Sequence, residues 1–332
     1  MSRFFDAVMR AERVRVIPAA GASEPQPLSW TARRLPRPFQ VISVANNKGG
    51  VGKTTIATNL AVELRAALPD VEVLVVGLDD QANLDRMFAP DGEPPGATHA
   101  TVLEALREGD LRSAIRPGRH GVHYVPGSAD VGELKREIRD PLHLETVLRR
   151  SDWRGLVVVD TKSDLEILTQ CALAASDLVL VVVKDLPSLL EAEKVFALLA
   201  RWGEPPERAR IVLSLVDLRV KYREGEDRDV LSLLVSEIRR RGHPLFEAFL
   251  SASPKVEALA TNPEGRLESI ARGAPGSIVH RQLRVLTDEV LAALGRARSG
   301  ADGPRADLAV RQPLKRRILQ RVATETPSAP AA

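Results

Sequence analysis

A short stretch near residue 50 contains residue types that bind phosphate groups. Residues 41–61 read VISVANNKGGVGKTTIATNLA, so an apolar run leads into a glycine-rich loop and then into Lys53 and Thr54. Backbone N–H groups of such a loop can approach an anion closely, and a helix that starts near Lys53 directs its positive end at the same point. We expect Lys53 to reach the β- and γ-phosphates of a nucleotide and the Thr54 hydroxyl to complete a Mg²⁺ shell. The stretch therefore predicts a site for a nucleoside triphosphate with magnesium.

The glycines of this loop, Gly49, Gly50 and Gly52, are expected to adopt φ values that other residues avoid. The strict pattern G-x-x-x-x-G-K-[ST] is not met, because Asn47 stands where the first glycine would be. A glycine cluster alone is a weak signal, since glycine-rich turns are common. Here an apolar strand, the glycines, a Gly-Lys-Thr triplet and a helical pattern coincide, and this combination favours a phosphate loop.

Two further apolar runs end in carboxylates. Residues 73–83 read VLVVGLDDQAN and place Asp79 and Asp80 directly after a run, where a plain turn is the alternative interpretation. Residues 155–164 read GLVVVDTKSD. A buried strand that ends in an aspartate such as Asp160 is the arrangement that holds the water ligands of Mg²⁺. The two segments supply the carboxylates that a magnesium nucleotide site requires.

The elements that position these residues follow from the hydrophobic pattern. Short valine-rich runs suit strands buried on both faces of a parallel sheet, and amphipathic stretches between them suit helices. The expected strands are Val41–Ala45, Val71–Leu78, Leu156–Val159, Leu178–Val183 and Ile211–Val216, and the expected helices include Thr54–Ala67, Ser188–Trp202 and Asp229–Arg241. Alternating strands and helices predict an α/β fold with a doubly wound, mostly parallel sheet flanked by helices.

Charge divides the chain of 332 residues into a body and two ends. Residues 1–39 carry seven basic and three acidic groups and several prolines, and residues 296–332 carry eight basic and three acidic groups. Residues 40–295 hold 32 basic and 38 acidic groups, so the body is acidic although the chain has a net charge of +3. We predict a basic, proline-rich N-terminal extension, one α/β domain and a basic, disordered C-terminal tail. Basic ends suit DNA or an anionic membrane, and solvated tails are the alternative.

Composition narrows the classes of protein. A lone cysteine, Cys171, rules out a disulfide framework and fits a reducing compartment. No apolar run approaches the roughly 18 residues that span a membrane, and the first residues carry no secretory signal, so we expect a cytoplasmic protein. His120 and His123 have no acidic or cysteine partner at ligand spacing, so the expected metal is Mg²⁺ alone.

The segment from Lys48 to Thr55 closely resembles the deviant Walker A motif, K-G-G-x-G-K-[ST]-T, of the ParA/MinD family of P-loop ATPases. The resemblance implies ATP and Mg²⁺ as cofactors, weak hydrolysis stimulated by a partner, and a homodimer in the ATP state. In relatives the lysine at the position of Lys48 reaches the ATP of the partner subunit, where an added cation can be worth about 10³–10⁵ in rate. Asn46-Asn47 before this lysine is more similar to the ParA branch than to the MinD branch. The resemblance implies nucleotide contacts from Lys48, Gly49, Gly50, Val51, Gly52, Lys53, Thr54 and Thr55, with catalytic roles for Lys48 and Lys53.

The two carboxylate segments extend the resemblance. Asp79 matches the second aspartate of the family's D-x-D-P-Q-G-N segment, which in relatives orients the attacking water, while Gly77 replaces the first aspartate and Asp80 the proline. Asp160 matches the Walker B aspartate that helps to hold Mg²⁺. Lys162 stands where the family usually has proline, and it either adds a cation near the nucleotide or faces water. Gly77 and Lys162 leave the rate of hydrolysis open.

A looser similarity continues to about residue 295. Residues 101–110 and 121–128 resemble the helix and the strand-proline segment of ParA proteins, and Ile211–Arg219 resembles their fifth strand and the loop after it. In relatives this loop carries an arginine that contacts DNA. Arg219, Lys221 and Arg223 are therefore candidate DNA contacts, and a solvated loop is the alternative.

Proteins of this family have several different functions, so the function of this chain must be inferred from its site residues and its surface. In the ParA-like interpretation the ATP dimer binds non-specific DNA near the nucleoid and segregates or positions a chromosome, plasmid or protein cargo, with a ParB-like or other partner that stimulates the ATPase. In the MinD-like alternative Leu314–Val322 forms a basic amphipathic helix that binds membrane, although its apolar face is thin and lacks aromatics. A third alternative is an ATP-gated scaffold with little hydrolysis. An iron–sulfur reductase is excluded, because it needs more cysteines.

Overall fold

The computed structural model describes residues 36–81, 83–90, 99–217, 221–224, 226–259, 261 and 266–299. Between residues 221 and 229 only the backbone is described. Most of the predicted N-terminal extension and C-terminal tail lies outside the described residues, and so does the predicted membrane segment Leu314–Val322. These predictions therefore stay predictions.

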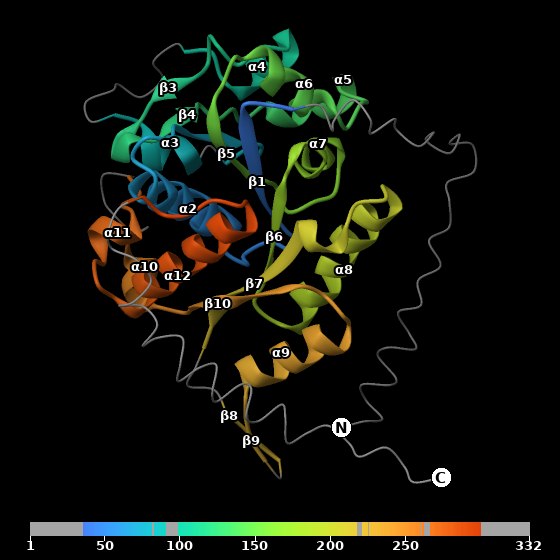
Figure 1. Ribbon diagram of the computed structural model, residues 1–332, viewed down its shortest axis with the longest axis vertical. Helices are drawn as coiled ribbons and strands as arrows, with labels where there is room; N and C mark the ends of the chain where they lie inside the picture. The colour runs from blue at the N-terminus through green and yellow to red at the C-terminus, as the bar shows by residue number, and fades with distance from the viewer. Residues whose placement is uncertain are drawn as a thin grey trace. The chain divides into compact units, whose positions relative to one another are not determined.

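Strands and helices alternate along the described chain (Figure 1). The strands are β1 (Phe39–Ala45), β2 (Val73–Gly77), β3 (Arg116–Pro117), β4 (His123–Val125), β5 (Gly155–Asp160), β6 (Leu178–Val183), β7 (Ala209–Val216), β8 (Lys221–Glu224), β9 (Glu226–Asp229) and β10 (Leu245–Ser251). The α-helices are α2 (Lys53–Ala67), α3 (Asn83–Phe88), α4 (Val102–Glu108), α5 (Leu134–Glu137), α6 (His143–Arg150), α7 (Ile167–Ala175), α8 (Leu186–Arg201), α9 (Val230–Arg240), α10 (Pro254–Ala258), α11 (Ile270–Gly273) and α12 (Ile278–Ala293). None of these helices is long and apolar enough to cross a membrane.

Eight of the described strands form one sheet in the order β10-β7-β6-β1-β5-β2-β4-β3. Neighbouring strands run parallel, except that β3 is antiparallel to β4. β1 lies between β5 and β6, and β2 lies on the far side of β5. The carboxyl ends of β1, β2 and β5 therefore meet at one edge of the sheet, which is where ligands bind in open α/β sheets. The predicted doubly wound α/β fold is confirmed.

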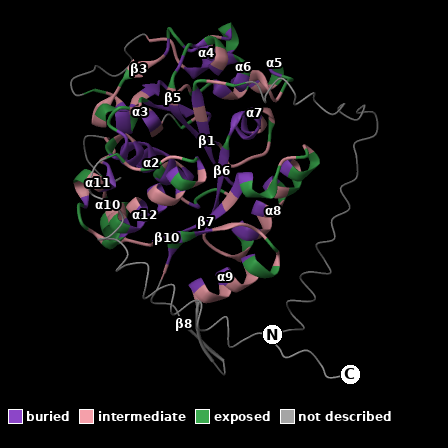
Figure 2. Ribbon diagram, viewed as in Figure 1, coloured by how far each residue is buried: buried purple, intermediate pink, exposed green. Residues whose placement is uncertain are grey.

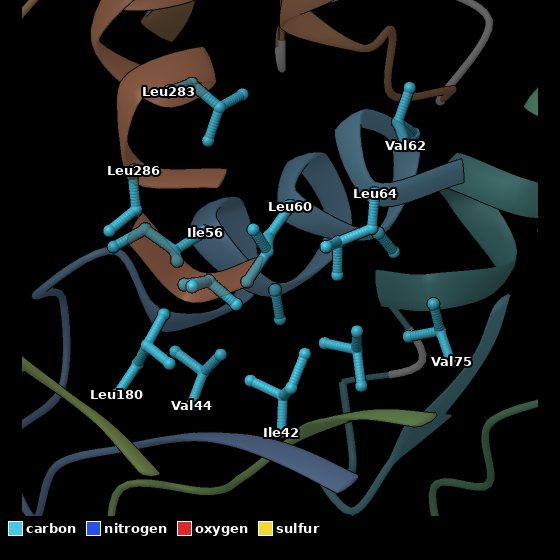
Figure 3. Close-up of a cluster of buried hydrophobic side chains, with 14 of the residues drawn as sticks. Ile42, Val44, Ile56, Leu60, Val62, Leu64, Val75, Leu180, Leu283 and Leu286 are labelled. Atoms are coloured by element: carbon cyan, nitrogen blue, oxygen red, sulfur yellow. The ribbon is translucent and has the colours of Figure 1, made fainter. Parts of the chain in front are cut away.

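One face of the sheet is covered by α2 and α12. Ile42 and Val44 of β1 lie beneath Ile56 and Leu60 of α2, and Leu283 of α12 packs in the same cluster (Figure 3). Because α2 contacts both the sheet and its neighbour α12, it is buried on more than one side. Each fully buried leucine or isoleucine stabilises the fold by about 1.5–3 kcal/mol, so the helix that begins at the phosphate loop is held firmly.

The opposite face is covered by two groups of helices. Val41 and Val157 pack with residues of α4, α6 and α7, while Val181 and Ile211 pack with residues of α8 and α9. The central strands are consequently buried from both sides, as the purple strands of Figure 2 show. This double burial is the physical reason for the continuous valine-rich runs in the sequence, and their prediction as buried strands is confirmed.

Several strands differ from the sequence expectations. The hydrophobic pattern does not predict β10, which lies at the edge of the described sheet beside β7. The apolar run of this strand is interrupted by the exposed Glu247. The segment after β7 was expected to be a loop, but its backbone forms an antiparallel ribbon of β8 and β9. Short or exposed strands are set by their pairing partners more than by their own apolar content.

Contacts of the α/β domain continue past residue 295, the predicted end of the domain. The N–H of Ser299 donates to the carbonyl oxygen of Ala67 at 2.9 Å, and the Arg298 guanidinium lies 2.9 Å from a carboxylate oxygen of Asp288. Residues 296–299 are therefore attached to the end of α2 and to α12.

Candidate functional site

The phosphate loop (residues 46–52) connects β1 to α2. Gly50 has a φ of 68° and Gly52 a φ of 93°, both in the left-handed region that residues with a Cβ avoid. Gly52 directly precedes α2, so the unpaired N–H groups of the helix open into the loop. Gly49 has no positive φ, and a Cβ there would meet only Ser163 Oγ at 3.7 Å. The prediction that all three glycines adopt such φ values is therefore wrong for Gly49.

Gly52 also approaches the end of β7 closely. A Cβ at Gly52 would lie 2.9 Å from Ser214 Oγ and 3.8 Å from the side chain of Leu215. Leu215 itself has a φ of 54°, which is unfavourable for a residue with a side chain, and it is 37% exposed. The end of β7 thus leaves no room for a side chain at Gly52.

Asn46 fixes the start of the loop. Its buried amide donates to the carbonyl oxygen of Val182 in β6 at 2.6 Å and to a carbonyl oxygen of α8 at 3.0 Å, and its Oδ1 accepts from the N–H of Lys48 at 2.9 Å. Asn47 donates to Glu191 of α8, and its φ is not positive. An amide can therefore stand where the strict pattern has its first glycine.

Lys53 directs its ammonium back into the loop. Lys53 Nζ donates to the carbonyl oxygen of Lys48 at 3.2 Å and to Ser163 Oγ at 2.6 Å, and the residue is 6% exposed. Burial lowers the pKa of Lys53, although the carboxylates of Asp160 and Asp79 act in the opposite direction. A buried ammonium with only neutral acceptors in direct contact is prepared to bind an anion such as a phosphate.

Asp160, the last residue of β5, is buried beside the start of α2. Its Oδ1 has no hydrogen-bond partner in the described part of the chain. Burial raises the pKa of Asp160 to about 7, and a hydrogen bond with Thr54 opposes this rise. A buried oxygen without a partner calls for an explanation, and a cation held together with the Thr54 hydroxyl supplies one. No cluster of three or more His, Cys, Asp or Glu side chains that could hold a metal ion occurs in the described ranges.

Lys48 lies at the outer side of the same loop. Its side chain is 32% exposed, and its Nζ lies 3.7 Å from a carboxylate oxygen of Asp185. Asp185 also caps α8, because its side chain accepts from the N–H of Ser188 at 2.8 Å. Of the other predicted contact residues, Val51 is fully buried and Thr55 is exposed. The described structure thus leaves Lys48 accessible at the molecular surface.

Two loops carry the remaining carboxylates: the β2 loop (residues 78–81) and the β5 loop (residues 161–166). In the β2 loop Asp79 Oδ1 accepts from the N–H of Gln81 at 3.0 Å, and burial raises the pKa of Asp79. Asp80 accepts a hydrogen bond from the Lys162 ammonium of the β5 loop, which lowers the pKa of Asp80 to about 2. Lys162 therefore joins the two loops, and its side chain stays 36% exposed to water. Its place relative to a bound nucleotide stays a prediction.

Comparisons with known proteins agree with this geometry. A family model described as an AAA domain matches residues 39–195. The chromosome-partitioning ATPase Soj of Thermus thermophilus is 34% identical over 252 residues, which cover 76% of this chain and 95% of that protein. This chain belongs to the ParA/MinD family of P-loop ATPases. The predicted family resemblance is confirmed.

Solved structures share the ParA/MinD fold. A putative plasmid partition protein of Borrelia burgdorferi bound to AMPPNP has a TM-score of 0.59 at 19% identity and covers 74% of this chain and 96% of its own. The septum site-determining protein MinD of Pyrococcus horikoshii, complexed with Mg-ADP, has a TM-score of 0.59 at 22% identity and covers 77% of this chain and 98% of its own. Identities this low show similarity of fold.

The structure accounts for one departure from the ParA/MinD pattern. A Cβ at Gly77 would lie 2.8 Å from Leu84 Cδ1 and 3.1 Å from its Cγ. The buried side chain of Leu84 therefore fills the space beside Gly77, where the family usually has an aspartate. An aspartate at this position would require Leu84 to move.

Three side chains near the site were not predicted from the sequence. Ser163 contacts Lys53, Asp185 contacts Lys48, and Leu215 packs against Gly52. Only the Asp185 position carries a local signal, because an aspartate three residues before a serine at a helix start is typical of a helix N-cap. The other two, in the β5 loop and in β7, are brought in by tertiary contacts between segments distant in the sequence.

The candidate DNA contacts are described only in part. Lys221 and Arg223 lie in β8, where the backbone register sets them opposite Asp229 and Asp227 of β9. Arg219 lies outside the described residues. Their role in DNA binding stays a prediction.

Proposed function

We propose that this ParA/MinD-family chain binds ATP with Mg²⁺ and hydrolyses it slowly. One observation carries the proposal: the buried Asp160 oxygen has no partner among the described residues and lies with Thr54 and Lys53 at the mouth of α2. A cation and an anion that arrive together satisfy both the carboxylate and the ammonium. The AMPPNP and Mg-ADP bound to the two similar structures support this assignment.

Each charged group has its own task in the proposed reaction. Lys53 and the N–H groups at the start of α2 hold the phosphates, and Thr54 and Asp160 hold Mg²⁺, which supplies positive charge to the phosphate oxygens. Asp79 accepts a hydrogen bond from a water and orients it toward the γ-phosphorus. The new bond joins the water oxygen to that phosphorus, a proton of the water passes to a phosphate oxygen, the bond to the bridging oxygen breaks, and ADP and phosphate leave.

Lys48 makes the proposed site dependent on a second copy of the chain. Its ammonium is partly exposed, and its ion pair with the described residues is the 3.7 Å contact with Asp185, so little free energy is needed to release it. We propose that it reaches the phosphates bound by the partner subunit when ATP is present. The dimer would then form with ATP and dissociate after hydrolysis.

A substitution at Lys48 tests this arrangement. Lys48→Ala is expected to keep its affinity for ATP and to lose the ATP-dependent dimer, because only the contact across the interface is removed. Light scattering with ATP and with ADP measures the effect, and Lys255→Ala, at an exposed lysine of α10, is the matched control. A Lys48→Ala dimer as stable as that of the parent would refute the role of Lys48 across the interface.

We further propose that the ATP dimer binds non-specific DNA and segregates or positions a chromosome, plasmid or protein cargo. The similarity to a chromosome-partitioning ATPase and the basic composition of both ends support this proposal. The protein would act in the cytoplasm on the nucleoid, and a ParB-like or other partner would stimulate hydrolysis. Contacts of lysine and arginine with DNA phosphates would make binding fall steeply with salt.

Co-sedimentation with DNA and with anionic vesicles, each with and without ATP, separates the candidate surfaces. The full chain should be compared with a form that ends at Ser299, because this form keeps the contacts of Arg298 and Ser299. ATP-dependent binding to DNA alone supports the proposal. Binding to vesicles alone, lost in the shortened form, would favour the membrane alternative of Leu314–Val322. Binding to neither surface without measurable turnover would leave an ATP-gated scaffold.

A further inference from the structure

Lys162 connects the two carboxylate loops across the edge of the sheet. It follows Asp160 by two positions in the β5 loop, and its ammonium donates to Asp80 Oδ2 in the β2 loop. The two side chains are 36% and 31% exposed, so neither is buried deeply enough for the pair to be a folding requirement. Asp80 is the immediate neighbour of Asp79.

The β5 loop is anchored independently of Lys162. Thr161 Oγ1 donates to the carbonyl oxygen of Val44 at 2.9 Å, Thr169 Oγ1 donates to Asp164 Oδ1 at 3.0 Å, and Lys135 Nζ lies 3.1 Å from Asp164 Oδ2. The β5 loop is therefore bonded to β1, α5 and α7, and these bonds hold its position without Lys162.

The β2 loop has fewer bonds to its surroundings. Leu78 donates its N–H to the carbonyl oxygen of Asp160 at 2.9 Å, and the side-chain bonds of Asp79 and Gln81 close a turn within the loop itself. Among the described hydrogen bonds and ion pairs of residues 79–81, the bond of Asp80 to Lys162 is the one that leaves the loop. The Asp79 carboxylate also interacts through space with Lys53 and Asp160.

We propose that Lys162 and Asp80 form a positioning pair that fixes the Asp79 carboxylate relative to Asp160 and the phosphate loop. The attraction between the two charges would hold the β2 loop in place, as a conformationally rigid loop sequence could also do. This inference rests on the proposed ATP hydrolysis, in which Asp79 orients the attacking water. Misplacement of a catalytic group by about 1 Å can cost on the order of a hundredfold in rate, so a pair that contributes little to folding can matter for turnover.

Steady-state kinetics of four variants tests the pair. Lys162→Met and Asp80→Asn are each expected to lower kcat about tenfold while the KM for ATP changes less than about twofold, because orientation of the water is lost but phosphate contacts remain. The double variant should lose no more than either single variant, since both remove the same interaction. Lys162→Arg should retain most of the parent kcat, because it keeps a cation at this position. Lys255→Met serves as the control for loss of an exposed lysine.

Hydrogen exchange of the nucleotide-free protein supplies a readout that does not require hydrolysis. In Lys162→Met the amides of the β2 loop should exchange faster than in the parent, while the exchange of α2 and the melting temperature stay the same. If the parent itself hydrolyses no ATP, the proposed function fails, but the exchange result still tests the pair.

Three outcomes would overturn the inference. The first is an unchanged kcat in Lys162→Met together with unchanged exchange of the β2 loop. The second is a double variant whose losses multiply, because the two residues would then act separately. The third is an equal loss of kcat in Lys162→Arg and Lys162→Met.

Discussion

The phosphate loop and the pair formed by the β2 and β5 loops surround the same site but are built differently. The phosphate loop takes its shape from its own backbone, with positive φ values at Gly50 and Gly52 and a helix that starts at Lys53. The β2 and β5 loops take their relative position from a bond between Lys162 and Asp80, which are 82 residues apart in the sequence. A conformation encoded locally is recognisable in the sequence, whereas a pairing between loops is recognisable only in the fold.

The two regions are also expected to have different tasks: the phosphate loop binds the nucleotide, and the β2 and β5 loops determine the rate of hydrolysis. The groups that would hold the triphosphate belong to the locally encoded loop and match the ParA/MinD motif closely. Three departures from the family, Gly77, Asp80 and Lys162, lie close in sequence to the carboxylates of Asp79 and Asp160 that would govern hydrolysis. Substitutions in the first region should therefore change affinity, and substitutions in the second should change rate.

The largest effect is expected at Lys53. Lys53→Ala removes the buried ammonium that would contact the β- and γ-phosphates, and loss of such charge-assisted bonds should weaken nucleotide binding roughly a hundredfold or more. Isothermal calorimetry with Mg-ATP measures the effect, and Lys255→Ala is the control. An affinity within about threefold of the parent would place the phosphates elsewhere.

The next effect is expected at Asp79, on rate and not on affinity. Asp79→Ala should slow hydrolysis on the order of a hundredfold, because the water is no longer oriented, and should prolong the ATP-bound dimer. Phosphate release gives the rate, and light scattering gives the lifetime of the dimer. Turnover equal to that of the parent would remove Asp79 from the mechanism.

A smaller effect, and a gain instead of a loss, is expected for the free energy of unfolding when Asp160 is replaced in the nucleotide-free protein. Burial raises the pKa of Asp160 to about 7. The unfolded chain releases this proton near pH 4, so the free energy of unfolding falls as the pH rises from about 4 to about 7. Asp160→Asn removes the buried charge and should be more stable than the parent by roughly 1–3 kcal/mol at pH 8, with a smaller difference at pH 5. Urea unfolding at both pH values checks this, and a variant less stable than the parent at pH 8 would contradict it.

The smallest effects are expected for alanine substitutions at two glycines of the phosphate loop, and they should differ in the free energy of unfolding. Gly52→Ala should lower the free energy of unfolding by about 1–2 kcal/mol, because its φ is unfavourable for alanine and its Cβ would press on Ser214. Gly49→Ala should cost less than about 0.5 kcal/mol, because it meets neither obstacle. Thermal or urea unfolding of both variants makes the comparison, and equal losses would show that backbone conformation does not separate them.

The sequence predicts the parts of this molecule whose structure depends on a local residue pattern. The central strands, α2, the phosphate loop and the family were all recognisable, because double burial produces valine runs and a phosphate loop needs glycine. The edge strand β10 and the β8–β9 ribbon were not, since strand pairing decides them. The partners of Lys162, Lys53 and Lys48 were also missed: no local pattern states that Asp80, Ser163 or Asp185 will lie beside them. The roles of the predicted site residues stay predictions until the variants are measured.

The attachment of Ser299 to Ala67 has a practical consequence. The helix α2 has 15 residues, so its far end lies about 22 Å from the residue at which it begins. A fluorophore, affinity handle or fusion partner joined directly after Ser299 would start at that distance from Lys53. Such a probe would report on assembly from a point away from the phosphate loop, which makes this position suitable for labelling.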